Sequence, residues 1–167
     1  DPIFGKPTSF YLFTLPALDL ISGWLLFLAI ITLAIAVVFF LIKRAGRALQ
    51  GPFGDYSVLS WSAVSSTFAF VLLAVAWRVY LSRYDAIFED HTIFGGVTYT
   101  DDHLILGGAL VICAALILGA AIAATNAVLR PRVNRLIAAP VPAVLCFLVI
   151  QVFAWYMTSF IVKPNEL

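Results

Sequence analysis

Apolar residues run almost without interruption through four long stretches of the chain, at about residues 21–42, 58–81, 104–129 and 136–162. Each stretch reaches the roughly 20 helical residues that cross about 30 Å of hydrocarbon. The stretches are continuously apolar rather than alternating, which indicates helices and not the strands of a membrane barrel. The pattern predicts an all-α polytopic membrane protein, with residues 1–167 forming a single module of four transmembrane helices.

The connections between these stretches differ in charge, and the difference predicts an orientation. The connection at residues 82–103 carries an excess of acids and forms an acidic loop. Six of the ten Lys and Arg residues lie in the other two connections: Lys43, Arg44, Arg47, Arg130, Arg132 and Arg135. Because short basic loops stay in the cytoplasm, we expect both termini and the acidic loop to be extracytoplasmic.

The residues ahead of the first stretch combine hydroxyl and aromatic side chains. Thr8 and Ser9 can cap a short helix that contains Phe10, Tyr11 and Phe13. Such a segment suits the membrane interface, so the sequence predicts a short interfacial helix before the first span. An extended segment of aromatic-belt residues explains the same pattern equally well.

The composition agrees with a membrane location and narrows the partners. The chain is 63% hydrophobic and 11% charged, with a mean hydropathy of +1.04, which is too apolar for a soluble domain. Its net charge of +1 provides no field for nucleic acid, so the expected partners are the lipid bilayer and other membrane helices or subunits. Cys113 and Cys146 lie inside apolar runs and are interpreted as buried free thiols.

Two of the stretches carry side chains that suggest close helix contacts. The third places Ala115, Gly119, Ala123 and Ala127 at successive i, i+4 positions, a smooth stripe for helix packing. The second is rich in hydroxyls, of which Ser62 and Ser66 are candidates for lining a polar cavity. The alternative is that these hydroxyls bond to carbonyls of their own helix or pack against a neighbour.

Gln151 and Arg78 are the strongly polar residues within or near a span. Gln151 lies near the middle of the fourth stretch, where an interhelical hydrogen bond or, less readily, a ligand contact is expected. Arg78 lies near the outer end of the second stretch, where it can snorkel to the headgroups or pair with a surface carboxylate. A sharper alternative pairs it with Asp85, Asp101 or Asp102, and Arg78 is also a candidate for ligand binding.

The acidic loop contains the other candidate chemistry. Its glycines permit a tight turn, and Thr100 or Asp101 can cap the third helix, which explains most of the tract structurally. Oxygen and imidazole ligands for a divalent cation are also present, although without a known metal spacing: Glu89, Asp90, His91, Asp101 and His103. Because no nucleophile, base and orienting group can be assembled elsewhere, we expect no enzymatic activity.

Three segments of the chain look familiar as a set. They are Asp1–Gly5 with Phe10–Pro16, then Arg83 and Tyr84 with Gly96, Tyr99–Asp101, His103 and Leu104, and finally Pro164–Leu167. In this order they resemble signatures of uncharacterised protein family 0182, which comprises large bacterial multi-pass membrane proteins with a big extracytoplasmic region. The resemblance implies an internal segment of such a protein in the bacterial cytoplasmic (inner) membrane. It implies no activity.

The leading functional hypothesis is a structural scaffold module of a larger bacterial membrane protein or complex. The small-residue stripe and the scarcity of charges in the spans favour this hypothesis. One alternative is a transporter or channel component with a polar path along the second span. Another is an accessory subunit of a respiratory or photosynthetic membrane complex. No cofactor is predicted, bound lipid is expected, and pigment binding has no support in the sequence.

Overall fold

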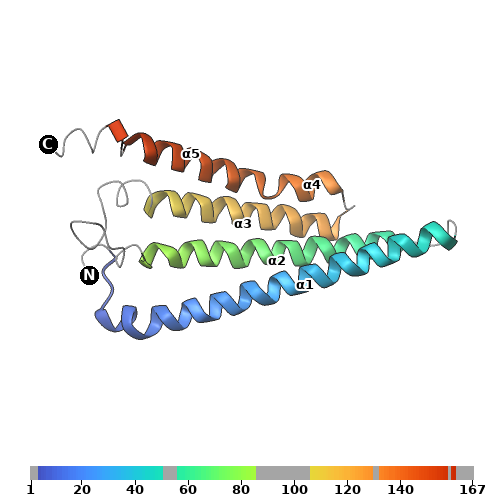
Figure 1. Ribbon diagram of the computed structural model, residues 1–167, viewed down its shortest axis with the longest axis horizontal. Coiled ribbons are helices and arrows are strands. Elements are labelled where there is room, and N and C mark those ends of the chain that lie inside the picture. The colour runs from blue at the N-terminus through green and yellow to red at the C-terminus, as the bar shows by residue number, and fades with distance from the viewer. Residues whose placement is uncertain (1–3, 51–55, 86–105, 130–131, 158, 161–167) are drawn as a thin grey trace.

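The computed structural model describes residues 4–50, 56–85, 106–129, 132–157, 159 and 160. The described residues form one π-helical turn followed by five α-helices (Figure 1): η1 (Phe10–Thr14), α1 (Leu15–Gln50), α2 (Tyr56–Asp85), α3 (Leu106–Val128), α4 (Val133–Ala138) and α5 (Val141–Met157).

Four helical segments are long and apolar enough to cross a membrane, so the prediction of an all-α chain with four such helices is confirmed. α1 alone contains 36 residues, which corresponds to about 54 Å at 1.5 Å per residue. This length exceeds the hydrocarbon thickness of about 30 Å, so α1 must tilt or extend beyond it. The four segments are Phe10–Ala45, Trp61–Asp85, Leu106–Val128 and Val133–Met157.

The long helices lie side by side in the order α1, α2, α3, α5, as a single layer (Figure 1). Each helix packs extensively only against its neighbours in this order. In the described residues, α1 and α5 form no extensive contact with each other, so the layer does not close into a four-helix bundle. Both broad faces of the layer, and the outer flanks of α1 and α5, are therefore left uncovered by the described residues.

The two ends of the layer differ in charge. The end formed by the start of α1, the end of α2 and the start of α3 carries Asp19 and Asp85 together with Arg83, and we call it the acidic end after the acidic loop that the sequence predicts at residues 82–103. The opposite end carries Lys43, Arg44, Arg132 and Arg135, and we call it the basic end. α5 ends at the acidic end, where α1 begins (Figure 1). The placement of the acidic end outside the cytoplasm stays a prediction.

Small side chains form the contacts between the helices. On α1 the buried residues Leu15, Ser22 and Ala29 are spaced by seven, the repeat that keeps one stripe of a helix against its neighbour. Among the described residues, the central core contains nine buried ones, and seven of them are alanine. Such side chains let helix backbones approach closely, which gains dispersion contacts in a solvent as apolar as the side chains.

The fourth predicted span is interrupted near its start. α4 ends at Ala138, Ala139 and Pro140 form a turn, and α5 begins at Val141. Pro140 and Pro142 lack the amide hydrogen that would bond to the carbonyl four residues earlier. The apolar pattern predicts one continuous run over 136–162, and the structure differs by this break.

The start of the first helix also differs from expectation. η1 continues directly into α1, and the N-cap residue Ser9 forms no side-chain capping bond. The expected separate short helix is thus the first turn of the long helix. Its location in the membrane interface stays a prediction.

Candidate functional site

An aromatic cluster at the acidic end ties the N-terminal segment to the end of α2. Its buried residues are Leu15, Leu81 and Tyr84. The ring of Tyr84 lies 4.8 Å from that of Phe4 and 5.2 Å from that of Phe10, measured between centroids. Tilted and edge-on aromatic pairs at these distances are favourable. The cluster therefore holds the segment ahead of α1 against α2.

Arg83 extends this anchoring to α3. Its Nε donates a hydrogen bond of 3.0 Å to the carbonyl oxygen of Leu106, the first residue of α3. The guanidinium carbon also lies 5.6 Å from the centroid of the Phe4 ring and 5.8 Å from that of Tyr80, within cation–π range. This cation is thus used to join three parts of the chain.

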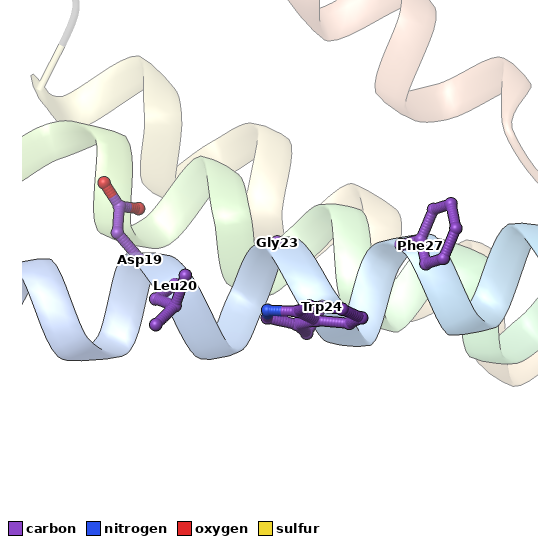
Figure 2. Close-up of a pocket in the computed structure, with 5 residues that line it drawn as sticks. All are labelled: Asp19, Leu20, Gly23, Trp24 and Phe27. Atoms are coloured by element: carbon purple, nitrogen blue, oxygen red, sulfur yellow. The ribbon is translucent and has the colours of Figure 1, made fainter.

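A pocket of about 390 Å³ lies along α1 near the acidic end. It is lined by Asp19, Leu20, Gly23, Trp24 and Phe27, which Figure 2 shows spread along about two turns of α1. The carboxylate is at one end of the row and Phe27 at the other (Figure 2). The pocket is therefore amphipathic along the helix axis, with a charged end and an apolar end.

Arg78 brings a positive charge from α2 to the side of this pocket. Its Nη1 lies 3.4 Å from the position that a Cβ would occupy on Gly23. Asp85, two turns further along α2, is within electrostatic range of both Arg78 and Asp19. Within the part of the chain that the structure describes, Arg78 forms no side-chain hydrogen bond or ion pair. The predicted alternatives Asp101 and Asp102 lie outside the described residues.

A second groove, of about 530 Å³, lies between α1, α2 and α3. Leu18, Leu73, Trp77 and Ile117 are among its apolar lining residues. Its thiol, Cys113, is buried and donates a 3.3 Å hydrogen bond to the carbonyl oxygen of Ala76. Cys146 is half-buried, and both cysteines are free, as the sequence indicated. The groove offers apolar contacts and little that would orient a polar ligand.

The hydroxyls of α2 are mostly engaged within their own helix. Ser66 donates to the carbonyl oxygen of Ala63 at 3.0 Å, and Thr67 bonds to the same oxygen at 2.9 Å. Ser62 is half-buried. This arrangement corresponds to back-bonding, the alternative that the sequence analysis weighed against a polar lining.

Asn126 is a polar residue that the sequence analysis missed. It is fully buried on α3, donates to the Ser65 hydroxyl at 3.0 Å and accepts from the backbone amide of Arg132 at 2.8 Å. Arg132 is the N-cap residue of α4, so one side chain links α2, α3 and α4 at the basic end. An amide in an otherwise apolar run was the signal that could have identified it.

The small-residue stripe of α3 lies in the interior of the layer. Ala115 and Ala123 are buried in the central core, and Ala127 is half-buried. At Gly119, a Cβ would collide with the carbonyl oxygen of Ala139, in the turn between α4 and α5. The broken fourth span therefore packs against the glycine of the stripe, backbone to backbone.

Gln151 has a different environment from the expected one. Its side chain is exposed on α5, and it forms no hydrogen bond to any described residue. The neighbouring Val149 and Val152 are also 66% and 65% exposed. This part of α5 is therefore an apolar surface with one amide in it.

The candidate metal ligands belong to the acidic loop. Glu89, Asp90, His91, Asp101 and His103 all lie outside the described residues. Among the residues that are described, no group of three or more His, Cys, Asp or Glu side chains could hold a metal ion.

Comparison with known proteins identifies the family. Residues 1–167 match the family described as "Uncharacterised protein family (UPF0182)". The UPF0182 protein of Cupriavidus necator is 32% identical over 174 residues, covering 100% of this chain and 18% of the relative. That of Nostoc sp. is 32% identical over 101 residues, covering 60% of this chain and 10% of the relative. That of Trichodesmium erythraeum is 29% identical over 174 residues, covering 100% and 18%.

The chain thus spans between a tenth and a fifth of the length of these relatives, as expected for a segment of a larger protein. No solved structure matches it. The match over the whole chain confirms the resemblance that the three sequence segments indicated, and the chain belongs to the uncharacterised protein family UPF0182.

Proposed function

We propose that this chain is a membrane-embedded scaffold module, and that other membrane helices of the full-length protein cover the outward face of α5. The observation that carries the proposal is the exposed amide of Gln151 in the middle of an apolar helix. An amide that faces lipid lacks hydrogen-bond partners, which is costly. A second helix with a polar side chain supplies them.

The shape of the layer supports the same role. Only 11% of the apolar 18-residue stretch within the Val133–Met157 segment is buried by the described residues, compared with 44% for the corresponding stretch of α3. The chain covers at most about 18% of the relatives cited above, so further polypeptide is available to pack against the uncovered flank. In this proposal the module sits in the bacterial cytoplasmic membrane, its acidic end is extracytoplasmic, and it has no catalytic role of its own.

Photocrosslinking in the full-length protein tests the proposal. A photoreactive amino acid at position 151 should crosslink to another segment of the same polypeptide or to a partner subunit. The matched control is position 35 on α1, where Ile35 is 63% exposed and equally apolar surroundings should yield mainly lipid adducts. Lipid adducts alone at position 151 would contradict the proposal. So would a stable, monodisperse form of the isolated 167-residue chain.

The transport alternative receives no specific support from the described residues. Ser66 and Thr67 donate to carbonyls of α2, and Ser65 accepts from Asn126, so these bonds have structural roles within and between the helices. Gln151 is on α5 and Ser62 on α2, two helices that have no extensive contact. An accessory role in a respiratory or photosynthetic complex is compatible with the scaffold proposal and is not favoured by a separate observation.

A further inference from the structure

The pocket on α1 combines features that an amphiphilic ligand would need. Asp19 is at one end, and Leu20, Trp24 and Phe27 continue toward the middle of the span. The two aromatic rings meet edge to face at 6.1 Å, and both are more than half exposed. From Asp19 to Phe27 the helix rises about 12 Å at 1.5 Å per residue. The pocket thus extends from the charged end of the layer into the apolar region.

The charges beside this pocket are arranged by depth. Arg78 lies beside Gly23, one turn inward from Asp19 on α1, and seven residues inward from Asp85 on α2. Seven residues correspond to about 10 Å along a helix. The positive group is therefore the deeper one, and the two carboxylates lie nearer the end of the layer.

A guanidinium in this position is stabilised either by a counter-charge or by access to the headgroups. Charged groups inside a membrane are costly unless they pair or reach the headgroups. Arg78 forms no ion pair within the described part of the chain, although Asp85 and Asp19 lie in electrostatic range of one another and of this region. A phosphate placed against the guanidinium would supply strong, charge-assisted hydrogen bonds.

We propose that this pocket binds one phosphatidylethanolamine molecule. The phosphate accepts from Arg78 beside Gly23, the primary ammonium donates to Asp19 and Asp85, and an acyl chain lies along Leu20, Trp24 and Phe27. In this lipid the phosphate is nearer the acyl chains than the ammonium, so its charges have the same order in depth as the protein groups. Gly23 has no side chain, which leaves room for the Arg78 guanidinium at the edge of the pocket, where the phosphate meets it.

Other phospholipids match these charges less well. Phosphatidylcholine carries a quaternary ammonium without N–H groups, so it cannot donate hydrogen bonds to the carboxylates. Phosphatidylglycerol is anionic and brings no positive group to Asp19 and Asp85. The inference is independent of the scaffold proposal, because it concerns α1 and the scaffold proposal rests on α5.

Native mass spectrometry of the full-length protein tests this inference. The protein is equilibrated with mixed micelles that contain equal amounts of phosphatidylethanolamine, phosphatidylcholine and phosphatidylglycerol, and the retained lipids are counted. We expect phosphatidylethanolamine to be retained about tenfold over phosphatidylcholine, the factor that corresponds to the loss of one charge-assisted hydrogen bond. Equal retention of the three lipids, or preference for phosphatidylglycerol, would overturn the inference.

Variants assign the recognition to individual groups. R78Q should lower retention of both zwitterionic lipids about tenfold, because it removes the charge that faces the phosphate. Asp19→Asn should lower phosphatidylethanolamine retention more than phosphatidylcholine retention, because only phosphatidylethanolamine loses hydrogen bonds as well as a Coulombic attraction, and the preference between the two should narrow. Arg44→Gln, at the basic end of α1, is the matched control and should change neither value.

If R78Q does not fold, the site is tested with two other variants, Asp19→Asn and Gly23→Leu. The leucine side chain of Gly23→Leu should block the pocket from the side of α1. Unchanged lipid selectivity in folded Asp19→Asn, or an effect of Arg44→Gln as large as that of R78Q, would refute the site. Crosslinking at position 151 tests α5 separately, so a negative result for one proposal does not affect the test of the other.

Discussion

The inner helices α2 and α3 and the outer helices α1 and α5 are all apolar, yet they differ sharply in how much of them this chain buries. The buried share of the apolar 18-residue stretch is 33% for α2 and 44% for α3, but 6% for the segment containing α1. Hydropathy is highest for that least buried segment, at 3.2, compared with 1.7 for α2. High apolarity therefore does not distinguish a helix that contacts lipid from one that contacts protein. A high content of small residues, in contrast, indicates contact with protein.

The largest effect that tests this comparison is expected at Gly119. In Gly119→Ala, the new methyl group collides with the carbonyl oxygen of Ala139, a backbone atom that cannot rotate away. Overpacking typically costs about 1–3 kcal/mol, and because the atom that is met belongs to the backbone we expect a loss of about 4 kcal/mol or more in the free energy of unfolding. We expect a lowered midpoint of thermal unfolding of the full-length protein, or loss of the folded form.

Gly107→Ala is the control for this substitution. A Cβ at Gly107 meets nothing within 4 Å, so the substitution should be neutral or stabilising by up to about 1 kcal/mol through helix propensity. Equal effects of the two alanines would show that α3 and the turn before α5 do not pack as described.

The second prediction concerns a leucine in the core of the layer. Leu72 is 5% exposed on α2 and belongs to the central cluster. Leu72→Ala should lower the free energy of unfolding by about 2–4 kcal/mol, because it removes packing and leaves a cavity. SDS titration of the purified protein, followed by tryptophan fluorescence, measures the change. A loss below about 0.5 kcal/mol, the range of surface substitutions, would contradict the packing of α2 against α3.

The third prediction concerns the buried hydrogen bonds at the basic end. In Asn126→Leu, the Arg132 amide loses its acceptor and the Ser65 hydroxyl loses a donor. The Ser65 hydroxyl is fully buried and the bond to the Arg132 amide is partly buried, and leaving a buried group unsatisfied costs about 1–3 kcal/mol. Thr125→Val is the matched neighbour, since Thr125 is exposed and bonds only to the carbonyl of Ile122, and its effect should be near zero. Hydrogen exchange should also show faster opening of the start of α4 in Asn126→Leu alone.

The smallest effect is expected on α1. Leu28 is 49% exposed, and a lipid acyl chain replaces what the side chain loses on truncation. Leu28→Ala should therefore change the free energy of unfolding by no more than about 0.5 kcal/mol in the same titration. A cost near that of Leu72→Ala would show that protein, rather than lipid, covers this face of α1.

Several features of the fold could be predicted because they depend on local composition. Run length predicted four spanning helices, and the glycine and alanines of α3 pointed to close packing, although not to which helix they meet. The break at Pro140 was readable in principle, because proline lacks the amide that a continuous helix requires. The capping role expected of Ser9 did not follow from its residue type, since the chain continues from a π-helical turn into α1.

The candidate site was harder to predict, because its residues are far apart in the sequence. Arg78 was identified as a residue that needs a partner, but Gly23, 55 positions earlier, gave no signal of its own. The same holds for Ser65 and Asn126, which are 61 residues apart and meet only because α2 and α3 are neighbours. Gln151 was expected inside an interface and is exposed in this segment.

The sequence by itself determined that this chain forms long apolar helices with one acidic and one basic end, because helix length and loop charge are local properties. It also determined the family. Only the tertiary structure decided that the helices form an open layer, that Arg78 lies beside a pocket on α1, and that Gln151 faces outward. These features depend on which faces of the helices meet. Because lipid is as apolar as the side chains, faces that contact lipid and faces that contact protein do not differ in hydropathy.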